Sequence, residues 1–187
     1  PSLVGGAFVD GTYGGDAANN YVADIAIPAD SGYTANSSVF DFMINCGGAG
    51  CAQSINLPVP GGIPAGAVYR KYSAGSGWVE FAVDANNILE SGTRESVDNT
   101  CANANEYAAG LNENDDCIRL TMRDGDPGID ADGNATNGII EDPGYLASVV
   151  IGFTDTRTSG TGGCSMSAEY VNPQSRADWW LIAGFLG

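Results

Sequence analysis

Histidine is absent from this sequence of 187 residues, and lysine occurs only once, at Lys71. Without histidine the chain has no Ser-His-Asp or Cys-His catalytic machinery and no His-ligated zinc or haem. The 7 Lys+Arg residues stand against 23 Asp+Glu residues, which gives a formal net charge of −16. This charge has the wrong sign for binding nucleic acid or an anionic membrane surface. Charged residues make up 16% of the chain and hydrophobic residues 43%, which argues against an acidic disordered tail.

The 5 cysteines contain no Cys-x-x-Cys pair, so the sequence lacks a zinc-ribbon or thioredoxin motif. Cys46 and Cys51 bracket a glycine-rich loop, and Cys101 and Cys117 bracket a polar, Asn-rich segment with little apolar material to hold it. We therefore expect two disulfides, Cys46–Cys51 and Cys101–Cys117, and an oxidising compartment. Cys164 is left over. The first residues lack the basic and apolar regions of a signal peptide, so export would require a preceding segment.

Short runs in which apolar and polar residues alternate are separated by clusters of Gly, Pro, Asn and Asp. This pattern is typical of strands, and no long helical periodicity precedes residue 170. We predict an all-β fold for residues 1–153, an antiparallel β-sandwich of about eight strands, Ig-like or jelly-roll-like. The runs at 68–72 and 78–83 suggest a hairpin. The predicted strands cover residues 3–9, 21–27, 39–44, 55–59, 68–72, 78–83, 118–123 and 145–153.

The end of the chain differs in character from the rest. Residues 154–172 form a predicted Gly/Ser/Thr linker that contains Cys164, and residues 173–187 form an apolar tail, helical or extended. The apolar run is too short to span a bilayer as a helix, which needs about 20 residues. It is the start of a longer membrane segment, an element that docks on a partner, or the last element of the core. Its candidate docking residues are Trp179, Trp180, Leu181, Ile182, Phe185 and Leu186.

Six carboxylates fall between Asp124 and Asp142, where they would repel one another if nothing neutralised them. Short Asp and Asn side chains at alternate positions can supply the oxygen ligands that Ca²⁺ prefers. The spacing matches an EF-hand loop in part, but the sixth place lacks glycine and the flanks read as strands. The alternatives are a loop of Asx turns without metal, and catalytic carboxylates. The candidate Ca²⁺ ligands are Asp124, Asp126, Asp130, Asp132, Asn134, Glu141 and Asp142.

Four ordered blocks, at residues 63–72, 78–87, 117–127 and 130–144, resemble the bacterial choice-of-anchor U domain. The resemblance covers about residues 38–153. It implies a surface protein of a Gram-negative bacterium without enzymatic activity. The tail, Gly162-Gly163-Cys164-Ser165 followed by an apolar run, is similar to a GlyGly-CTERM sorting signal. That likeness implies that Gly162, Gly163 and Cys164 form a processing and lipid-anchoring site at the outer membrane.

We therefore expect a non-enzymatic, extracytoplasmic domain at the bacterial cell surface, structural or adhesive in role and stiffened by disulfides and Ca²⁺. Its partner would be the outer membrane, or an envelope or filament protein bound through the tail, and a homo-oligomer is left open. One alternative is a subunit of an extracellular filament or envelope complex that docks through residues 179–186. A remote alternative is a glycan hydrolase that uses Asp124, Asp126 and Glu141, with Trp78 or Tyr69 as a sugar platform.

Overall fold

Two antiparallel sheets make up the computed structural model, which describes residues 1–3, 5–94, 100–101, 107–127, 129–132 and 136–150. One sheet has the strand order β1-β5-β10-β8-β9 and the other β2-β4-β11-β6-β7, with β3 paired to the far end of β11. The strands are β1 (Ser2–Leu3), β2 (Ala7–Asp10), β3 (Tyr33–Ala35), β4 (Phe40–Asn45), β5 (Ala52–Pro58), β6 (Val68–Ser73), β7 (Gly77–Glu80), β8 (Ile88–Gly92), β9 (Ala108–Ala109), β10 (Cys117–Arg123) and β11 (Ile139–Val149).

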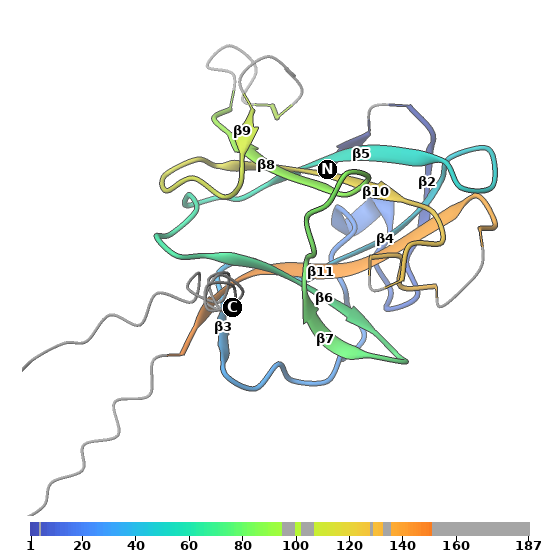
Figure 1. The fold of residues 1–187 in the computed structure, drawn as a ribbon. Coiled ribbons are helices and arrows are strands. Elements are labelled where there is room, and N and C mark those ends of the chain that lie inside the picture. The colour runs from blue at the N-terminus through green and yellow to red at the C-terminus, as the bar shows by residue number, and fades with distance from the viewer. Residues whose placement is uncertain (4, 95–99, 102–106, 128, 133–135, 151–187) are drawn as a thin grey trace, which may run out of the picture. The chain divides into compact units, whose positions relative to one another are not determined.

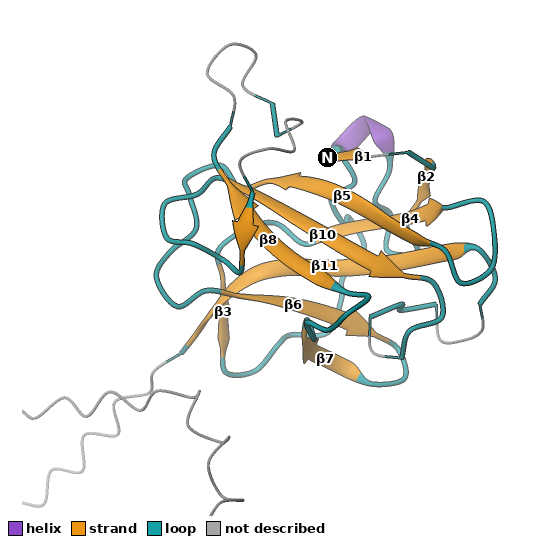
Figure 2. Ribbon diagram, turned by 45° about the horizontal axis from the view of Figure 1, so that its top comes forward, coloured by secondary structure: helices purple, strands orange, loops and turns teal. Residues whose placement is uncertain are grey.

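The sheets stack face to face as a β-sandwich, as Figure 1 shows. Alternate residues of β10 and β5 face the core of the sandwich, and alternate residues of β4 face it from the other sheet. The predicted all-β sandwich is confirmed, with eleven strands in the described residues where about eight were expected. The only helix among those residues is the 3₁₀ turn η1 (Ala17–Asn19), shown in purple in Figure 2.

The predicted hairpin is present as β6 and β7, which pair from Arg70 with Glu80 to Ser73 with Gly77. The predicted strand at 21–27 is wrong, because this segment makes a single bridge, Val22 with Phe40. Its start is bent, since Asn20 and Tyr21 both adopt positive φ. The predicted strand at 3–9 is divided between the two sheets as β1 and β2.

Strand β11 begins earlier than the sequence indicated. The prediction started this strand at Tyr145, whereas β11 starts at Ile139 and lies in the middle of its sheet between β4 and β6. Glu141 and Asp142, which we assigned to an acidic loop, are therefore strand residues. Because successive residues of a strand point to opposite faces, these two carboxylates lie on different sides of the sheet.

Both predicted disulfides are present, Cys46–Cys51 and Cys101–Cys117. The first lies in the connection between the end of β4 and the start of β5, and so closes the link between the two sheets at one end of the sandwich. The second ties residue 101 to the first residue of β10, which is fully buried.

Residues 1–152 form one compact unit. The predicted linker 154–172, the tail 173–187 and the proposed processing residues Gly162, Gly163 and Cys164 lie outside the described residues, as does Asn134. Within the part of the chain that is described, no helix has the length and apolar character needed to cross a membrane.

Candidate functional site: an acidic loop held by main-chain amides

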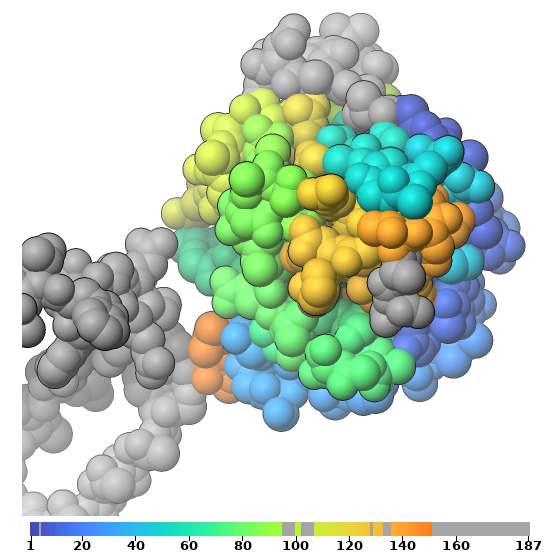
Figure 3. Space-filling model, turned by 45° about the vertical axis from the view of Figure 1, so that its right-hand side comes forward, coloured from blue at the N-terminus to red at the C-terminus, as the bar shows by residue number. Residues whose placement is uncertain are grey.

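Four of the acidic residues predicted to bind a cation lie between β10 and β11, in residues 124–138, which we call the acidic loop; they are Asp124, Asp126, Asp130 and Asp132. This segment lies against the Cys46–Cys51 loop, so three stretches distant in sequence meet at one end of the sandwich. Figure 3 shows the cyan segment that precedes and begins β5 next to the orange start of β11 and the yellow segment after β10. The cluster is thus defined by tertiary contacts between two loops and a strand.

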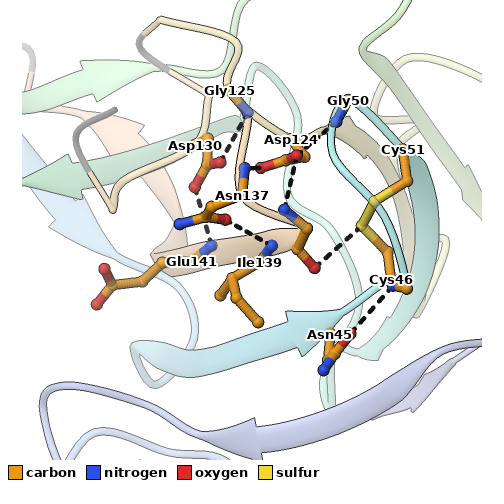
Figure 4. The surroundings of a disulfide bond; sticks show 12 residues. Asn45, Cys46, Gly50, Cys51, Asp124, Gly125, Asp130, Asn137, Ile139 and Glu141 are labelled. Atoms are coloured by element: carbon orange, nitrogen blue, oxygen red, sulfur yellow. Dashed lines mark hydrogen bonds between the residues drawn. A yellow bond between two sulfur atoms is a disulfide. The ribbon is translucent and has the colours of Figure 1, made fainter. Parts of the chain in front are cut away.

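Asp124 is the centre of this cluster, with its residue only 1% exposed. Its Oδ2 accepts hydrogen bonds from the Gly50 amide at 2.6 Å and the Gly138 amide at 2.9 Å, and its Oδ1 accepts one from the Asn137 amide at 3.1 Å. Burial raises the pKa of Asp124, but the three amides outweigh that effect and the pKa is lowered overall. Asp124 therefore links two loops through these hydrogen bonds, as Figure 4 shows.

Asp130 organises the second half of the loop in the same way. Its Oδ2 accepts from the Gly125 amide at 2.9 Å, and its Oδ1 accepts from the amides of Glu141 at 3.1 Å and Asp132 at 3.3 Å. Here burial dominates, so the pKa of Asp130 is raised despite these amides. Asp130 also contributes to the lowered pKa of Asp124, so the two carboxyl groups are coupled.

Two glycines allow this close packing. Gly125 has a φ of +77°, and a Cβ there would lie 2.7 Å from Cγ2 of Thr136. Gly138 has a φ of +86° and lies against the backbone of Gly48, which a Cβ would approach to 3.3 Å. Both positions need a left-handed backbone and little volume, which only glycine supplies without strain.

Two asparagines complete the hydrogen bonding, and our prediction did not include either. Asn137 donates its side-chain amide to Asp132 at 2.6 Å and accepts from the Ile139 amide at 2.7 Å. Asn87, fully buried, donates to Asp126 at 2.7 Å and accepts from the Arg123 amide at 3.1 Å. The Asp-x-x-Asn spacing from Asp84 to Asn87 was the available sequence signal, because it is typical of an Asx turn.

Glu141 and Asp142 point to opposite faces of β11, so they do not form one ligand set with the acidic loop. Glu141 lies on the outer face of its sheet, and burial raises its pKa, an effect that Thr12 partly offsets. Asp142 points into the core, where it contacts Lys71. The candidate metal residues are thus distributed over a loop and both faces of a strand.

The chemistry shown by the described residues is hydrogen bonding between carboxylates and amides. Among those residues, no three Cys, Asp or Glu side chains form a group that could hold a metal ion. A Ca²⁺ site uses six to eight oxygen ligands, whereas amides already occupy oxygens of Asp124 and Asp130. Calcium binding by this loop stays a prediction.

In comparisons with known proteins, no family model, curated protein or solved structure matches the chain. The assignment of a role therefore depends on the residues themselves. Tyr69 is fully buried, so its suggested role as a sugar platform is wrong. Trp78 lies at the edge of its sheet, where its indole N–H donates to the Pro28 carbonyl at 2.6 Å and its ring contacts Tyr145.

Proposed function

We propose that this protein is a non-enzymatic, extracytoplasmic domain of a bacterial surface protein, with a structural or adhesive role. The observation that carries the proposal is the pair of disulfides on an all-β sandwich. Disulfides persist in oxidising compartments such as the periplasm and the cell exterior, and are rare in the cytosol. The resemblance to the choice-of-anchor U domain supports placement at the surface of a Gram-negative cell.

The arrangement of polar groups also supports a structural role. Asp124 and Asp130 each accept three main-chain amides, so their oxygens maintain the shape of the loop. Buried carboxylates in this setting contribute to stability because the amides would otherwise lack partners. These hydrogen bonds hold the described part of the loop in place at one end of the sandwich.

The redox state of the cysteines in the natural cell tests the location. Cells would be treated with a membrane-permeant alkylating reagent before lysis, and the purified protein would then be mapped by mass spectrometry. We expect Cys46, Cys51, Cys101 and Cys117 to be protected until reduction. Labelling of these four cysteines without reductant would contradict an oxidising compartment. Digestion of intact cells by an added protease then distinguishes surface display from the periplasm.

We also propose that the acidic loop binds Ca²⁺ and that this binding stabilises the fold. We expect Ca²⁺ to raise the melting temperature of the full chain and EDTA to lower it, with Mg²⁺ at the same concentration acting less. Asp132→Asn should weaken the response, whereas Glu113→Gln, an exposed residue that precedes β10 and lies away from the loop, should leave it unchanged. A melting temperature that is the same with EDTA and with Ca²⁺ would remove calcium from the proposal.

The second candidate is a subunit of an extracellular filament or envelope complex, favoured by the apolar sequence from Trp179 to Leu186. Burial of such a segment in a neighbour releases about 25 cal/mol per Å² of apolar surface before ordering costs. Deletion of residues 173–187 should abolish assembly measured by sedimentation. Normal assembly of the shortened protein would exclude this role for the tail.

A further inference from the structure

The core of the sandwich contains an ion pair that the role of the acidic loop does not explain. Lys71, the only lysine of the chain, is 1% exposed, and Asp142 is fully buried. The Lys71 Nζ lies 2.6 Å from Oδ1 of Asp142. The two residues come from neighbouring strands, β6 and β11, and both side chains point toward the other sheet.

This pair has few other polar partners. An ammonium group has three N–H donors, and within the described residues Nζ has one further contact, with the Met122 sulfur at 3.5 Å. A thioether is a weak acceptor, so among the described residues Asp142 is the carboxylate in contact with the Lys71 amine. Two ions held in an apolar core lose most of their hydration energy, a penalty of several kcal/mol per ion. The pair therefore depends on the contact between its two members to offset this loss of hydration.

The third member of the group is Tyr69, whose hydroxyl donates to Oδ2 of Asp142 at 3.3 Å. Tyr69 is fully buried, and burial raises its pKa well above its usual value, so the hydroxyl keeps its proton. The lysine and the tyrosine thus approach different oxygens of one carboxyl group. This arrangement leaves Oδ1 next to the amine and holds Oδ2 in a hydrogen bond.

The backbone leaves space for the group at Gly144. Gly144 is paired with Lys71 across the two strands. A Cβ at this position would lie 2.7 Å from the Tyr69 hydroxyl and 2.9 Å from Oδ1 of Asp142. Any other residue would displace the tyrosine or the carboxyl group, so Gly144 is required for the contact.

We propose that Lys71 and Asp142 condense in the folded protein to an intramolecular amide bond between Nζ and Cγ. One proton first passes from the ammonium to Oδ1, which gives a neutral amine and a carboxylic acid. The nitrogen lone pair attacks Cγ while the Tyr69 hydroxyl stabilises the negative charge that develops on Oδ2. The Cγ–Oδ1 bond then breaks, and Oδ1 leaves as water with a second proton from nitrogen.

The reaction needs no oxidant, metal or second substrate. An ammonium and a carboxylate are converted to one amide and one water, so atoms and charge balance. Condensation removes both buried charges, and the fold holds the reacting groups at contact distance, which replaces a bimolecular encounter. The bond would join two adjacent strands of the six-stranded sheet. The proposal does not depend on the cellular location of the protein.

Mass spectrometry of the full chain after reduction of the disulfides tests the bond. We expect a mass below that of the sequence by one water molecule. Since Asp-Gly sequences can also lose water as succinimides, the position is decided by trypsin, which cuts after unmodified Lys and Arg. A linked protein yields a branched peptide that joins residues 71–94 to 124–157, and neither arm contains cysteine.

An unlinked protein instead yields separate peptides 72–94 and 124–157, because trypsin then cuts after Lys71. Detection of these two peptides as the dominant products of the wild-type protein would overturn the proposal. Lys71→Arg should lack both the water loss and the branched peptide. As a matched control, Arg70→Lys places a lysine beside Asp30 on the outer face, and should show the same single water loss as wild type. A second linkage in this control would show that proximity without the core site is sufficient.

Discussion

Asp124 and Asp142 are equally buried, yet they are stabilised in different ways. Asp124 is 1% exposed and accepts three main-chain amides, which lower its pKa despite burial. Asp142 is fully buried and has Lys71 and Tyr69 as partners, and there burial dominates and raises its pKa. Burial alone does not decide the state of a carboxyl group, because the number and kind of donors around it decide the outcome.

The difference follows from local structure. The acidic loop contains glycines and turns whose amides are free of ladder hydrogen bonds, so they can converge on Asp124. In the middle of β11 the amides are used in pairing with β4 and β6. A carboxyl group that points into the core from such a strand can be satisfied only by side chains, and these come from β6.

The largest effect on the contrast between Asp124 and Asp142 is expected when Lys71, the partner of Asp142 in the core, is removed. Lys71→Met should lower the free energy of unfolding by about 3–5 kcal/mol, because the side chain of Asp142 loses Lys71 and is left as an uncompensated buried carboxyl group. Urea denaturation at neutral pH measures the change. The double variant Lys71→Met/Asp142→Leu should recover part of the loss, since no buried charge remains. A double variant less stable than Lys71→Met would contradict this explanation.

Removal of the Asp124 carboxylate from the acidic loop should lower the free energy of unfolding by a smaller amount. Asp124→Ala should lower the free energy of unfolding by about 2–3 kcal/mol, because the amides of Gly50, Asn137 and Gly138 lose their acceptor. Asp126→Ala, which removes a carboxylate with one side-chain donor, Asn87, should cost about 1 kcal/mol. Equal effects of the two substitutions in urea denaturation would show that the amides of the loop find other partners.

The Cys46–Cys51 disulfide, which lies next to the acidic loop, allows a further test of the hydrogen bond between Gly50 and Asp124. Replacing Cys46 and Cys51 by alanine should cost about 2 kcal/mol, because the bond closes a short loop, with a sequence separation of 5. Gly50, which lies in that loop, donates to Asp124. The combined variant with Asp124→Ala should therefore lose less than the two separate losses added together. Additive losses would show that the disulfide and Asp124 act independently.

The smallest expected effect is on the pH dependence of stability. The pKa of Asp124 is lowered in the folded protein, so its contribution is complete above its unfolded pKa and is lost as pH falls through the folded pKa. The pKa of Asp130 is raised, so protonation at low pH relieves a destabilising charge. Asp124→Asn should make the loss of stability in acid shallower, and Asp130→Asn should make it steeper. Urea midpoints from neutral pH down to about pH 3 measure both slopes.

Identical slopes for both variants and the wild type would show that the two carboxyl groups do not titrate differently on unfolding. A reversal of the two slopes would assign the lowered pKa to Asp130.

The local sequence pattern was sufficient to predict several parts of the structure. The alternation in β4, β5 and β10 identified which residues face the core, and the Ser/Gly-rich segment between Tyr72 and Trp78 identified the hairpin. Cysteines close in sequence identified both disulfides, because short loops bring their sulfurs together at little entropic cost. In contrast, the segment 21–27 has a strand-like pattern but makes only one bridge, because the amides of Asp24 and Ile25 donate to the carbonyl of Tyr13 and not to a neighbouring strand.

The sequence by itself determined the class of fold, the two disulfides and the concentration of carboxylates after β10. Only the tertiary structure decided what each carboxylate does. A period of two residues shows that Asp142 and Glu141 face opposite sides, but not which side is buried or which strand lies alongside. The pairing of Gly144 with Lys71 joins segments more than seventy residues apart, and no local signal encodes that register. For that reason the acidic loop could be located from sequence, whereas the contact between Lys71 and Asp142 could not.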